Sequence, residues 1–448
     1  MRGCSLSTQR RLRAKNAAQK RWHNEEVHDN DVQIADPKMM AIACIENGST
    51  YTKSRGILAA QGIESPPKST YYYNQRKVNA TVKELCNESL KKEADKMTPN
   101  TVITLDGAYA HRRNSSMCHA AFMNHTTNKI VAGSVVTKAR KGGDFYGSSN
   151  MLETECIRRN LQQIDINKVE KFCHDRDNKT GDLMAKAKPG INEIIDANHA
   201  KKGFETCWKK LINGVYNATT SIKKSAVNNA KKAITFVTNV EYKKNFTGLK
   251  THVKRWFEYL LKKKDWNADK KAIKWKNVEQ HVIGNHDACN HRKNVKYVWK
   301  KGVQNEFLRN DFHSFVEDTQ KIFLNVDPNV STNKNESLHA EASRIADKNV
   351  PWGRDSYEAR ISYTYLKHNE PENCSQMIRE RNRVKSNIVD QRFIEERARE
   401  RVQRSATRST PEYKESERKR REKFRKEMST KKGDYIGIPY SQLCNDNK

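Results

Sequence analysis

The sequence predicts a mixed α/β fold of the α+β kind, preceded by helices, interrupted by a mostly helical insertion and followed by a charged tail. Three consecutive strand-like runs come first in the central part of the chain, and alternating helix and strand patterns follow them. A long lysine-rich stretch of helical character then separates this region from a last helical segment. A chain of 448 residues is long enough for two or more structural units.

The chain is strongly basic, with 85 Lys and Arg against 53 Asp and Glu and a formal net charge of +32. Such a charge attracts polyanions, so nucleic acid is the expected partner. A membrane partner is not expected, because no run of about 18 apolar residues occurs and the N-terminus lacks an apolar signal-like core. Ten scattered cysteines indicate reduced thiols in a soluble, intracellular protein.

Residues 1–36 are basic and then acidic without apolar periodicity, which predicts a flexible arm. The arm could contact DNA, or it could be a solvated tail or a nuclear localisation signal.

Residues 37–98 have the pattern of three helices with short turns, with Ser49 and Ser65 as candidate N-caps and Gly48 and Gly62 as candidate stops. A helix-turn-helix fits this pattern, although many three-helix segments bind no DNA.

Residues 99–199 carry the strand signals. TVITLDGAY, SMCHAAFMN and IVAGSVVTK predict an antiparallel meander, because they alternate and a polar turn joins the last two. A helix (ETECIRRNLQQI), a strand (VEKFCHD), a helix (TGDLMAKAK) and a strand (GINEIIDAN) then follow. This order is that of an RNase H-like domain.

Three segments follow the expected first part of this domain. We expect residues 200–330 to form a helical insertion and residues 331–376 to form the last part of the core. Residues 377–448 are expected to form a charged tail of exposed helices or disorder.

Three acids stand where a metal site would need them. Asp106 ends the apolar run VITL, Asp175 ends the run VEKFCH, and Glu336 opens the helix of TNKNESLHAEASRIADK. Two carboxylates on adjacent strand ends and a third on a helix across the sheet can share two Mg²⁺ or Mn²⁺ ions, which prefer oxygen ligands. The alternative is that strand-end aspartates only cap the following turns.

A second cluster, His281, His286, Cys289 and His291, falls within HVIGNHDACNH. Imidazole and thiol at this density suit tetrahedral Zn²⁺, although the spacing is not that of a standard zinc finger. The alternative is a basic loop that contacts DNA.

The central region resembles the Mutator-like DDE transposases. The resemblance rests on a small residue with Met-Glu before a helix, an Asp-Arg pair ending a strand, an Asp-x-x-His-x-x-K pattern and an Asn-Glu-Ser block with a downstream Lys and a closing Asn. In this sequence these are Met151 and Glu153, Asp175 and Arg176, Asp196, His199 and Lys201 or Lys202, Asn335, Glu336 and Ser337, Lys348, and Asn369. The matches run in order over roughly residues 40–370.

The resemblance implies a catalytic triad of Asp106, Asp175 and Glu336 that binds two Mg²⁺ or Mn²⁺ ions. Asp177 is the alternative second ligand, but Asp175 is favoured because it ends the apolar run. His199 is implied to lie near the active site, where it could contact the scissile phosphate or a leaving oxygen, or serve only in packing.

The implied activity is cleavage at transposon ends and strand transfer into target DNA by a dimer or larger assembly, in the nucleus if the host is eukaryotic. The alternatives are a domesticated or inactive DNA-binding relative, and an RNase H-like nuclease or integrase of another lineage.

Overall fold

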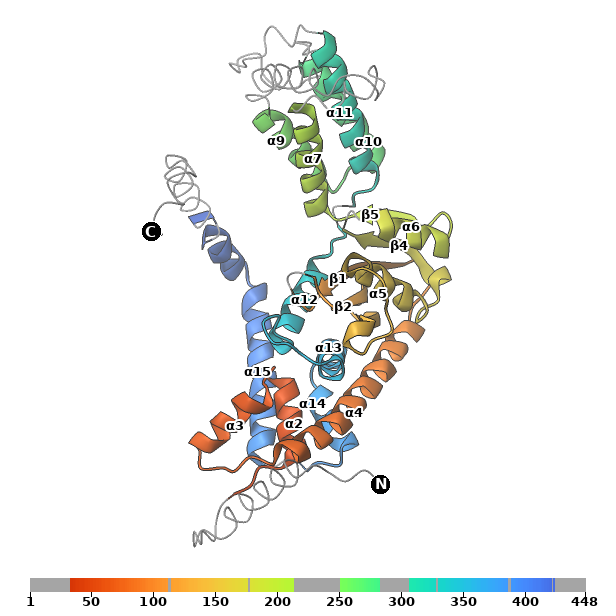
Figure 1. The fold of residues 1–448 in the computed structure, drawn as a ribbon. Coiled ribbons are helices and arrows are strands. Elements are labelled where there is room, and N and C mark those ends of the chain that lie inside the picture. The colour runs from red at the N-terminus through yellow and green to blue at the C-terminus, as the bar shows by residue number, and fades with distance from the viewer. Residues whose placement is uncertain are drawn as a thin grey trace, which may run out of the picture. The chain divides into compact units, whose positions relative to one another are not determined.

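Five strands form one mixed sheet in the order β3-β2-β1-β4-β5 (Figure 1). The predicted mixed α/β architecture is therefore confirmed. The strands are β1 (Thr101–Tyr109), β2 (Met117–Asn124), β3 (Ile130–Thr137), β4 (Val169–His174) and β5 (Asn192–Ile195). The computed structural model describes residues 33–111, 114–175, 178–212, 250–282, 306–327, 329–385, 388–420 and 422–423.

The central strand β1 has an antiparallel neighbour on one side and a parallel neighbour on the other. Asp106 pairs with Ala121 of β2, and Thr104 pairs with Cys173 of β4. β5 continues the sheet parallel to β4. The three parallel strands therefore direct their carboxyl ends to the same edge of the sheet.

The two faces of the sheet are covered by different helices. Apolar side chains of β1, including Ile103 and Leu105, pack with α5 (Leu152–Leu161) and α6 (Asn178–Ala187). Alternate residues of β1 face α12 (Asn333–Ile345), because Thr104 bonds to Asn335 of that helix. α13 (Arg354–Asn369) packs against β3, where Gly133 leaves room for the Tyr365 ring.

Within the described residues, three helices precede the sheet: α2 (Pro37–Glu46), α3 (Tyr51–Ala60) and α4 (Lys68–Asp95). Gly48 and Gly62 adopt positive φ angles of 64° and 71° after α2 and α3, as expected for helix stops. The two predicted N-caps were wrong. Thr50 rather than Ser49 caps α3, accepting from Lys53 N at 3.3 Å. The α4 helix begins only at Lys68, because the two prolines after Ser65 delay it.

A buried arginine attaches these helices to the core. The side chain of Arg360, on α13, is fully buried, and its Nη2 donates to the carbonyls of Cys44 (3.3 Å) and Ser49 (2.6 Å). The guanidinium also lies over the Trp352 ring, 4.0 Å from its centroid. The turn between α2 and α3 is thereby fixed to α13.

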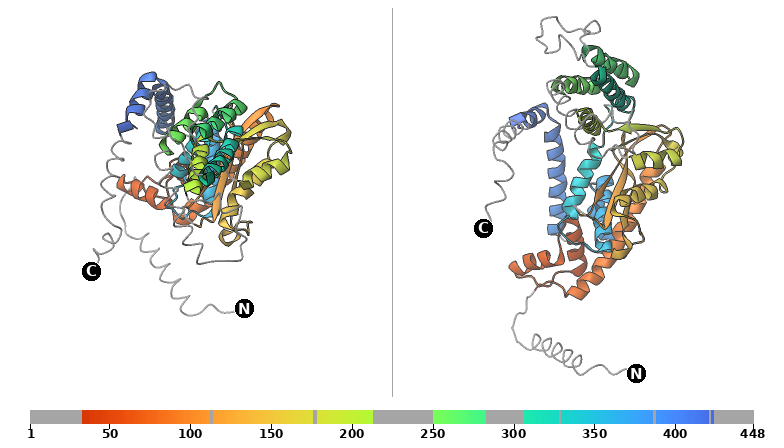
Figure 2. Two further views of the ribbon diagram at one scale, coloured as in Figure 1. Left: turned by 90° about the horizontal axis from the view of Figure 1, so that it is seen from above. Right: turned by 45° about the horizontal axis from the view of Figure 1, so that its top comes forward.

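The described part of residues 200–330 is helical, as predicted. Figures 1 and 2 show α7 (Ala197–Ile212), α9 (Lys250–Lys262), α10 (Ala268–Val282) and α11 (Glu306–Leu324) grouped as one bundle. The bundle has its own aromatic core around Trp208, Phe257, Trp275 and Phe315. Its first helix begins at Ala197. Within the described segments, no helix is long and apolar enough to cross a membrane.

Residues from Glu372 onward form a second compact unit. It contains α14 (Cys374–Arg381) and α15 (Ile388–Ser409), so the described part of the predicted tail is helical. A two-pronged ion pair joins these helices, with Arg379 Nε 2.7 Å and Nη2 3.0 Å from the two carboxylate oxygens of Asp390.

Candidate active site

The parallel strands bring three aspartates to one edge of the sheet. Thr104 pairs with Cys173 and His174 pairs with Ile195, so continuing both registers aligns Asp106, Asp175 and Asp196. Neighbouring strands lie about 4.8 Å apart, which makes this row compact. The sequence suggested that Asp106 ends its strand. In the structure β1 continues to Tyr109, because its last residues pair with β2.

Within this row, Asp196 has a structural role. It is 1% exposed, and its two carboxylate oxygens accept from Asn198 N at 2.7 Å and Thr332 N at 3.1 Å. These bonds tie the start of α7 to the residue that precedes α12. The third strand-end acid thus holds two helices in place rather than facing a ligand.

Asn335 positions Glu336. The buried Asn335 side chain accepts from Thr104 Oγ1 at 2.6 Å and donates to the carbonyls of Ala121 (3.2 Å) and Thr104 (3.4 Å). These contacts fasten the first turn of α12 across β1 and β2. Glu336, the next residue, is exposed in that first turn and lies near enough to add to the charge felt by Asp106.

Glu153, on α5, brings a fourth carboxylate to Asp106. A Cβ atom at Gly107 would lie 2.6 Å from Glu153 Cγ and 2.7 Å from its Oε1, so only glycine allows this approach. The absence of a side chain at Gly107 therefore opens β1 to an acid from the opposite face of the sheet.

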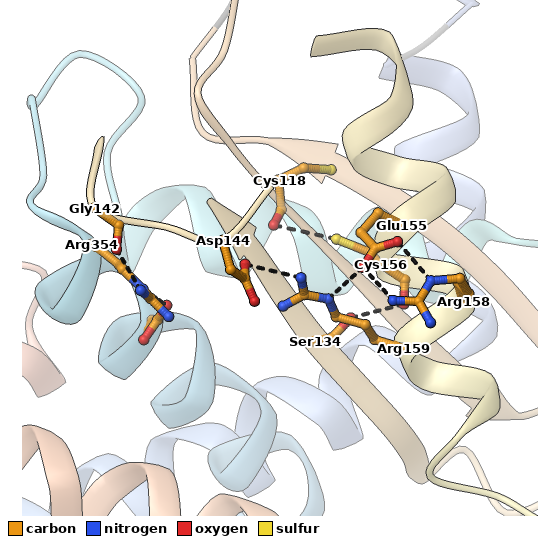
Figure 3. A network of polar contacts seen from close by, with 10 residues as sticks. Cys118, Ser134, Gly142, Asp144, Glu155, Cys156, Arg158, Arg159 and Arg354 are labelled. Carbon is orange, nitrogen blue, oxygen red and sulfur yellow. Dashed lines mark hydrogen bonds and ion pairs between the residues drawn. The ribbon is translucent and has the colours of Figure 1, made fainter. Parts of the chain in front are cut away.

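Several contacts attach α5, the helix that carries Glu153, to the sheet (Figure 3). Cys156 Sγ donates to the Cys118 carbonyl at 3.4 Å, and the Cys156 carbonyl accepts from Ser134 Oγ at 2.9 Å. Arg159 pairs with Asp144 at 3.0 Å and with Glu155 at 2.8 Å. These bonds attach α5 to β2, β3 and the loop after β3.

Negative charge accumulates around Asp106. Burial, together with the carboxylates of Asp175, Glu153 and Glu336, raises the pKa of Asp106 to about 8. Burial also raises the pKa of Asp175, whereas His199 and Lys202 oppose that rise. A carboxyl whose pKa is raised by burial and by neighbouring acids is common at functional sites.

His199 lies in the first turn of α7 rather than at a strand end. Its Nε2 atom is 2.9 Å from Asp175 Oδ2, and the Lys202 ammonium is 3.2 Å from the same nitrogen. Asp175 is therefore oriented by His199. Asp177, the alternative second acid, lies outside the described residues.

The donor set fits a hard divalent cation in its chemistry. Asp106, Asp175, Glu153 and Glu336 offer only oxygen, the ligand that Mg²⁺ and Mn²⁺ prefer. Their mutual repulsion at Asp106 is the kind of charge that a cation would relieve. Among the described residues, no three or more His, Cys, Asp or Glu side chains are positioned together so that they could hold a metal ion.

Comparison with known proteins gives no assignment. No protein-family model matches the chain, and a comparison with curated proteins finds no match.

The zinc prediction concerns residues that the structure does not describe. The backbone of His281 lies in α10, whereas its side chain and the whole of His286, Cys289 and His291 fall outside the described residues. Structural Zn²⁺ at this cluster stays a prediction.

Two neighbours of Asp106 were not predicted as site residues. Glu153 was noted only within the Met-Glu pattern, and its contact with Gly107 depends on how α5 packs. His339 of α12 has its Nε2 3.5 Å from Asp106 Oδ2. The sequence signal for His339 was its position three residues after Glu336, which places both near the same face of a helix.

Proposed function

We propose that the protein is a metal-dependent polynucleotidyl transferase with an RNase H-like core, acting as a DDE transposase similar to the Mutator-like group. The strand order supports this core, because three antiparallel strands are followed by two that extend the sheet in parallel. The helical bundle between β5 and α12 supports an insertion ahead of the third acid.

The observation that carries the proposal is that Asp175, from the strand beside β1, and Glu336, from the helix that crosses it, both raise the pKa of Asp106. These acids, with Glu153 beside them, would hold the cations. Two such ions, about 3.5–4 Å apart when bound, would stabilise the charge on the attacking and leaving oxygens of a phosphoryl displacement. His199 would keep Asp175 in its orientation through the 2.9 Å contact.

The reaction has two displacements at phosphorus. In the first, water attacks a phosphodiester at the element end, so the bond from phosphorus to the 3′-oxygen breaks and a 3′-hydroxyl is released. In the second, that hydroxyl attacks a phosphodiester of target DNA and displaces another 3′-oxygen. Asp106 is 15% exposed and Asp175 is 40% exposed, so the acids border solvent that DNA could replace.

The N-terminal helices would recognise the element ends. The turn between α2 and α3 is short and contains Gly48, as in helix-turn-helix motifs. Nearly all of α3 is exposed, including Lys53, Arg55 and Ile57, so this helix has a surface free to enter a groove. Arg360 would keep this module attached to the core.

The helical bundle would supply a second DNA contact through a row of aromatic and lysine side chains. Trp256 and Tyr259 are 39% and 46% exposed and stack with centroids 5.7 Å apart. Lys263 lies 4.9 Å from the Tyr259 centroid and 5.7 Å from that of Trp266, and Lys270 lies 4.8 Å from Trp266. Alternating rings and ammonium groups can stack on bases and contact phosphates of an unpaired strand.

DNA affinity should then depend on phosphate contacts and fall steeply with salt, with a log-log slope of about −0.9 per phosphate neutralised. We further propose assembly as a dimer or larger on paired ends, and location with DNA, in the nucleus of a eukaryotic host.

Cleavage of supercoiled plasmid in Mg²⁺ or Mn²⁺ tests the activity. We expect nicks that end in 3′-hydroxyls, abolished by Asp106→Asn or Glu336→Gln. The matched controls are Asp95→Asn, on the exposed end of α4, and Glu170→Gln, on β4 away from the row, which should both cleave normally. Cleavage that persists in EDTA, or that both triad variants retain, would exclude the proposal.

A further inference from the structure

A chain of buried polar groups ends at Asp106. The Tyr357 hydroxyl of α13 is 2.8 Å from His119 Nδ1 on β2. His119 Nε2 is in turn 3.0 Å from His339 Nδ1 on α12. His339 Nε2 lies 3.5 Å from Asp106 Oδ2. Three elements that are distant in sequence thus contribute one side chain each to a series of polar contacts that ends at Asp106 of β1.

Solvent contributes little to this chain. Tyr357, His119 and His339 are 1%, 2% and 8% exposed. Burial lowers the pKa of His119 well below its ordinary value, so this imidazole is neutral near pH 7. A neutral imidazole has one nitrogen that donates and one that accepts. His339 Nε2 is buried and makes no hydrogen bond of normal length, and it lies 3.5 Å from the carboxylate oxygen Oδ2 of Asp106.

The hydrogen bonds from Tyr357 to Asp106 can be donated in only one direction when Asp106 is ionised. A carboxylate only accepts, so the proton of His339 must sit on Nε2 and its Nδ1 must accept from His119. The proton of His119 must then sit on Nε2, and its Nδ1 must accept from the Tyr357 hydroxyl. All three protons therefore point toward Asp106.

The carboxylate is held from a second side as well. Asp106 Oδ1 accepts from the Gly107 amide at 2.9 Å, while Oδ2 faces His339. Contacts at both oxygens restrict rotation of the carboxylate plane. Such outer contacts commonly orient metal-binding carboxylates, and their loss weakens metal binding about 10- to 100-fold.

We propose that His339 is a positioning residue for Asp106, oriented through His119 by the Tyr357 hydroxyl, and that it presents the carboxylate to a divalent cation. The inference rests on the proposed function. It differs from a packing role for these rings, because it requires a donor at the Nε2 position of residue 339 and fixed tautomers at both histidines.

Two substitutions at one position separate these roles. His339→Gln places an amide donor near the former Nε2, whereas His339→Asn places its amide near the former Nδ1 and leaves Asp106 without a donor. Calorimetric titration with Mn²⁺ should show near wild-type affinity for His339→Gln and about 10- to 100-fold weaker affinity for His339→Asn. Thermal melting of both proteins checks that each is folded.

Long-range proton–nitrogen NMR of the metal-free protein provides a readout that needs no metal and no activity. At a pH above the Asp106 pKa of about 8, where this carboxyl is ionised, we expect both His119 and His339 as Nε2-protonated tautomers, and we expect Tyr357→Phe to relax the tautomer of His119. A charged or Nδ1-protonated His339 at that pH overturns the inference. If wild-type protein binds Mn²⁺ and the two variants at position 339 bind it equally, the inference alone fails. Wild-type protein that binds no Mn²⁺ overturns the proposed function and this inference with it.

Discussion

Replacing Asn335 by alanine should both destabilise the core and release the helix that carries Glu336. The change removes a 2.6 Å bond from Thr104 Oγ1 and a 3.2 Å bond to the Ala121 carbonyl, together with a weaker 3.4 Å contact. Each good bond contributes about 1 kcal/mol, and leaving the buried Thr104 hydroxyl without a partner costs about 1–3 kcal/mol. The expected loss of unfolding free energy is therefore about 3 kcal/mol.

A double-mutant cycle with Thr104→Val isolates the contact, because valine removes the hydroxyl while keeping the shape of the side chain. The combined variant should lose less stability than the two single losses added together, with a coupling of about 1–2 kcal/mol. Urea unfolding gives these values. Plasmid cleavage by Asn335→Ala should also fall by about 100-fold, since a displacement of about 1 Å at a reacting group has that effect. Additive stability losses, or cleavage at the wild-type rate, would refute the role of Asn335.

Three further outcomes are expected. In metal-free protein, the raised pKa of Asp106 means that its protonated form stabilises the fold at low pH, and this stability is lost as pH rises from about 4 to about 8. The variant Asp106→Asn should therefore melt at a higher temperature than wild type at pH 8 but not at pH 4. A difference in melting temperature that stays constant between these pH values would contradict this. Arg360→Met removes bonds to two backbone carbonyls and should cost about 2–4 kcal/mol, with faster proteolysis at the turn between α2 and α3; an unchanged cleavage pattern would count against it. Gly107→Ala should displace Glu153 and lower plasmid cleavage about tenfold or more, whereas Gly353→Ala, which meets open space, should not; equal activity of the two variants would exclude a role for Glu153.

Local patterns were sufficient to predict the sheet and the helices around it. The alternation of TVITLDGAY and the apolar run VEKFCH gave two neighbouring strands, and parallel strands place their following acids together. The length of β1 was misjudged because its last residues pair only with β2, a contact distant in sequence. The cap of α3 was misplaced by one residue, since Ser49 and Thr50 are equally suited to the role and only the backbone geometry chooses between them.

The surroundings of the candidate site depended on packing that no local pattern contains. In the sequence, Glu153 resembles any acid in the first turn of a helix, where the helix dipole favours a negative charge. Its approach to Asp106 requires both the packing of α5 and the missing side chain of Gly107. His119 and His339 meet across 220 residues of sequence, so their contact could be found only in the folded chain.

Crystals soaked in Mn²⁺ would reveal the proposed metal site itself, because anomalous scattering locates that metal independently of any activity. Two peaks are expected about 3.5–4 Å apart, bounded by Asp106, Asp175 and Glu336. No peak beside Asp106, or Mn²⁺ bound only elsewhere on the protein, would contradict it.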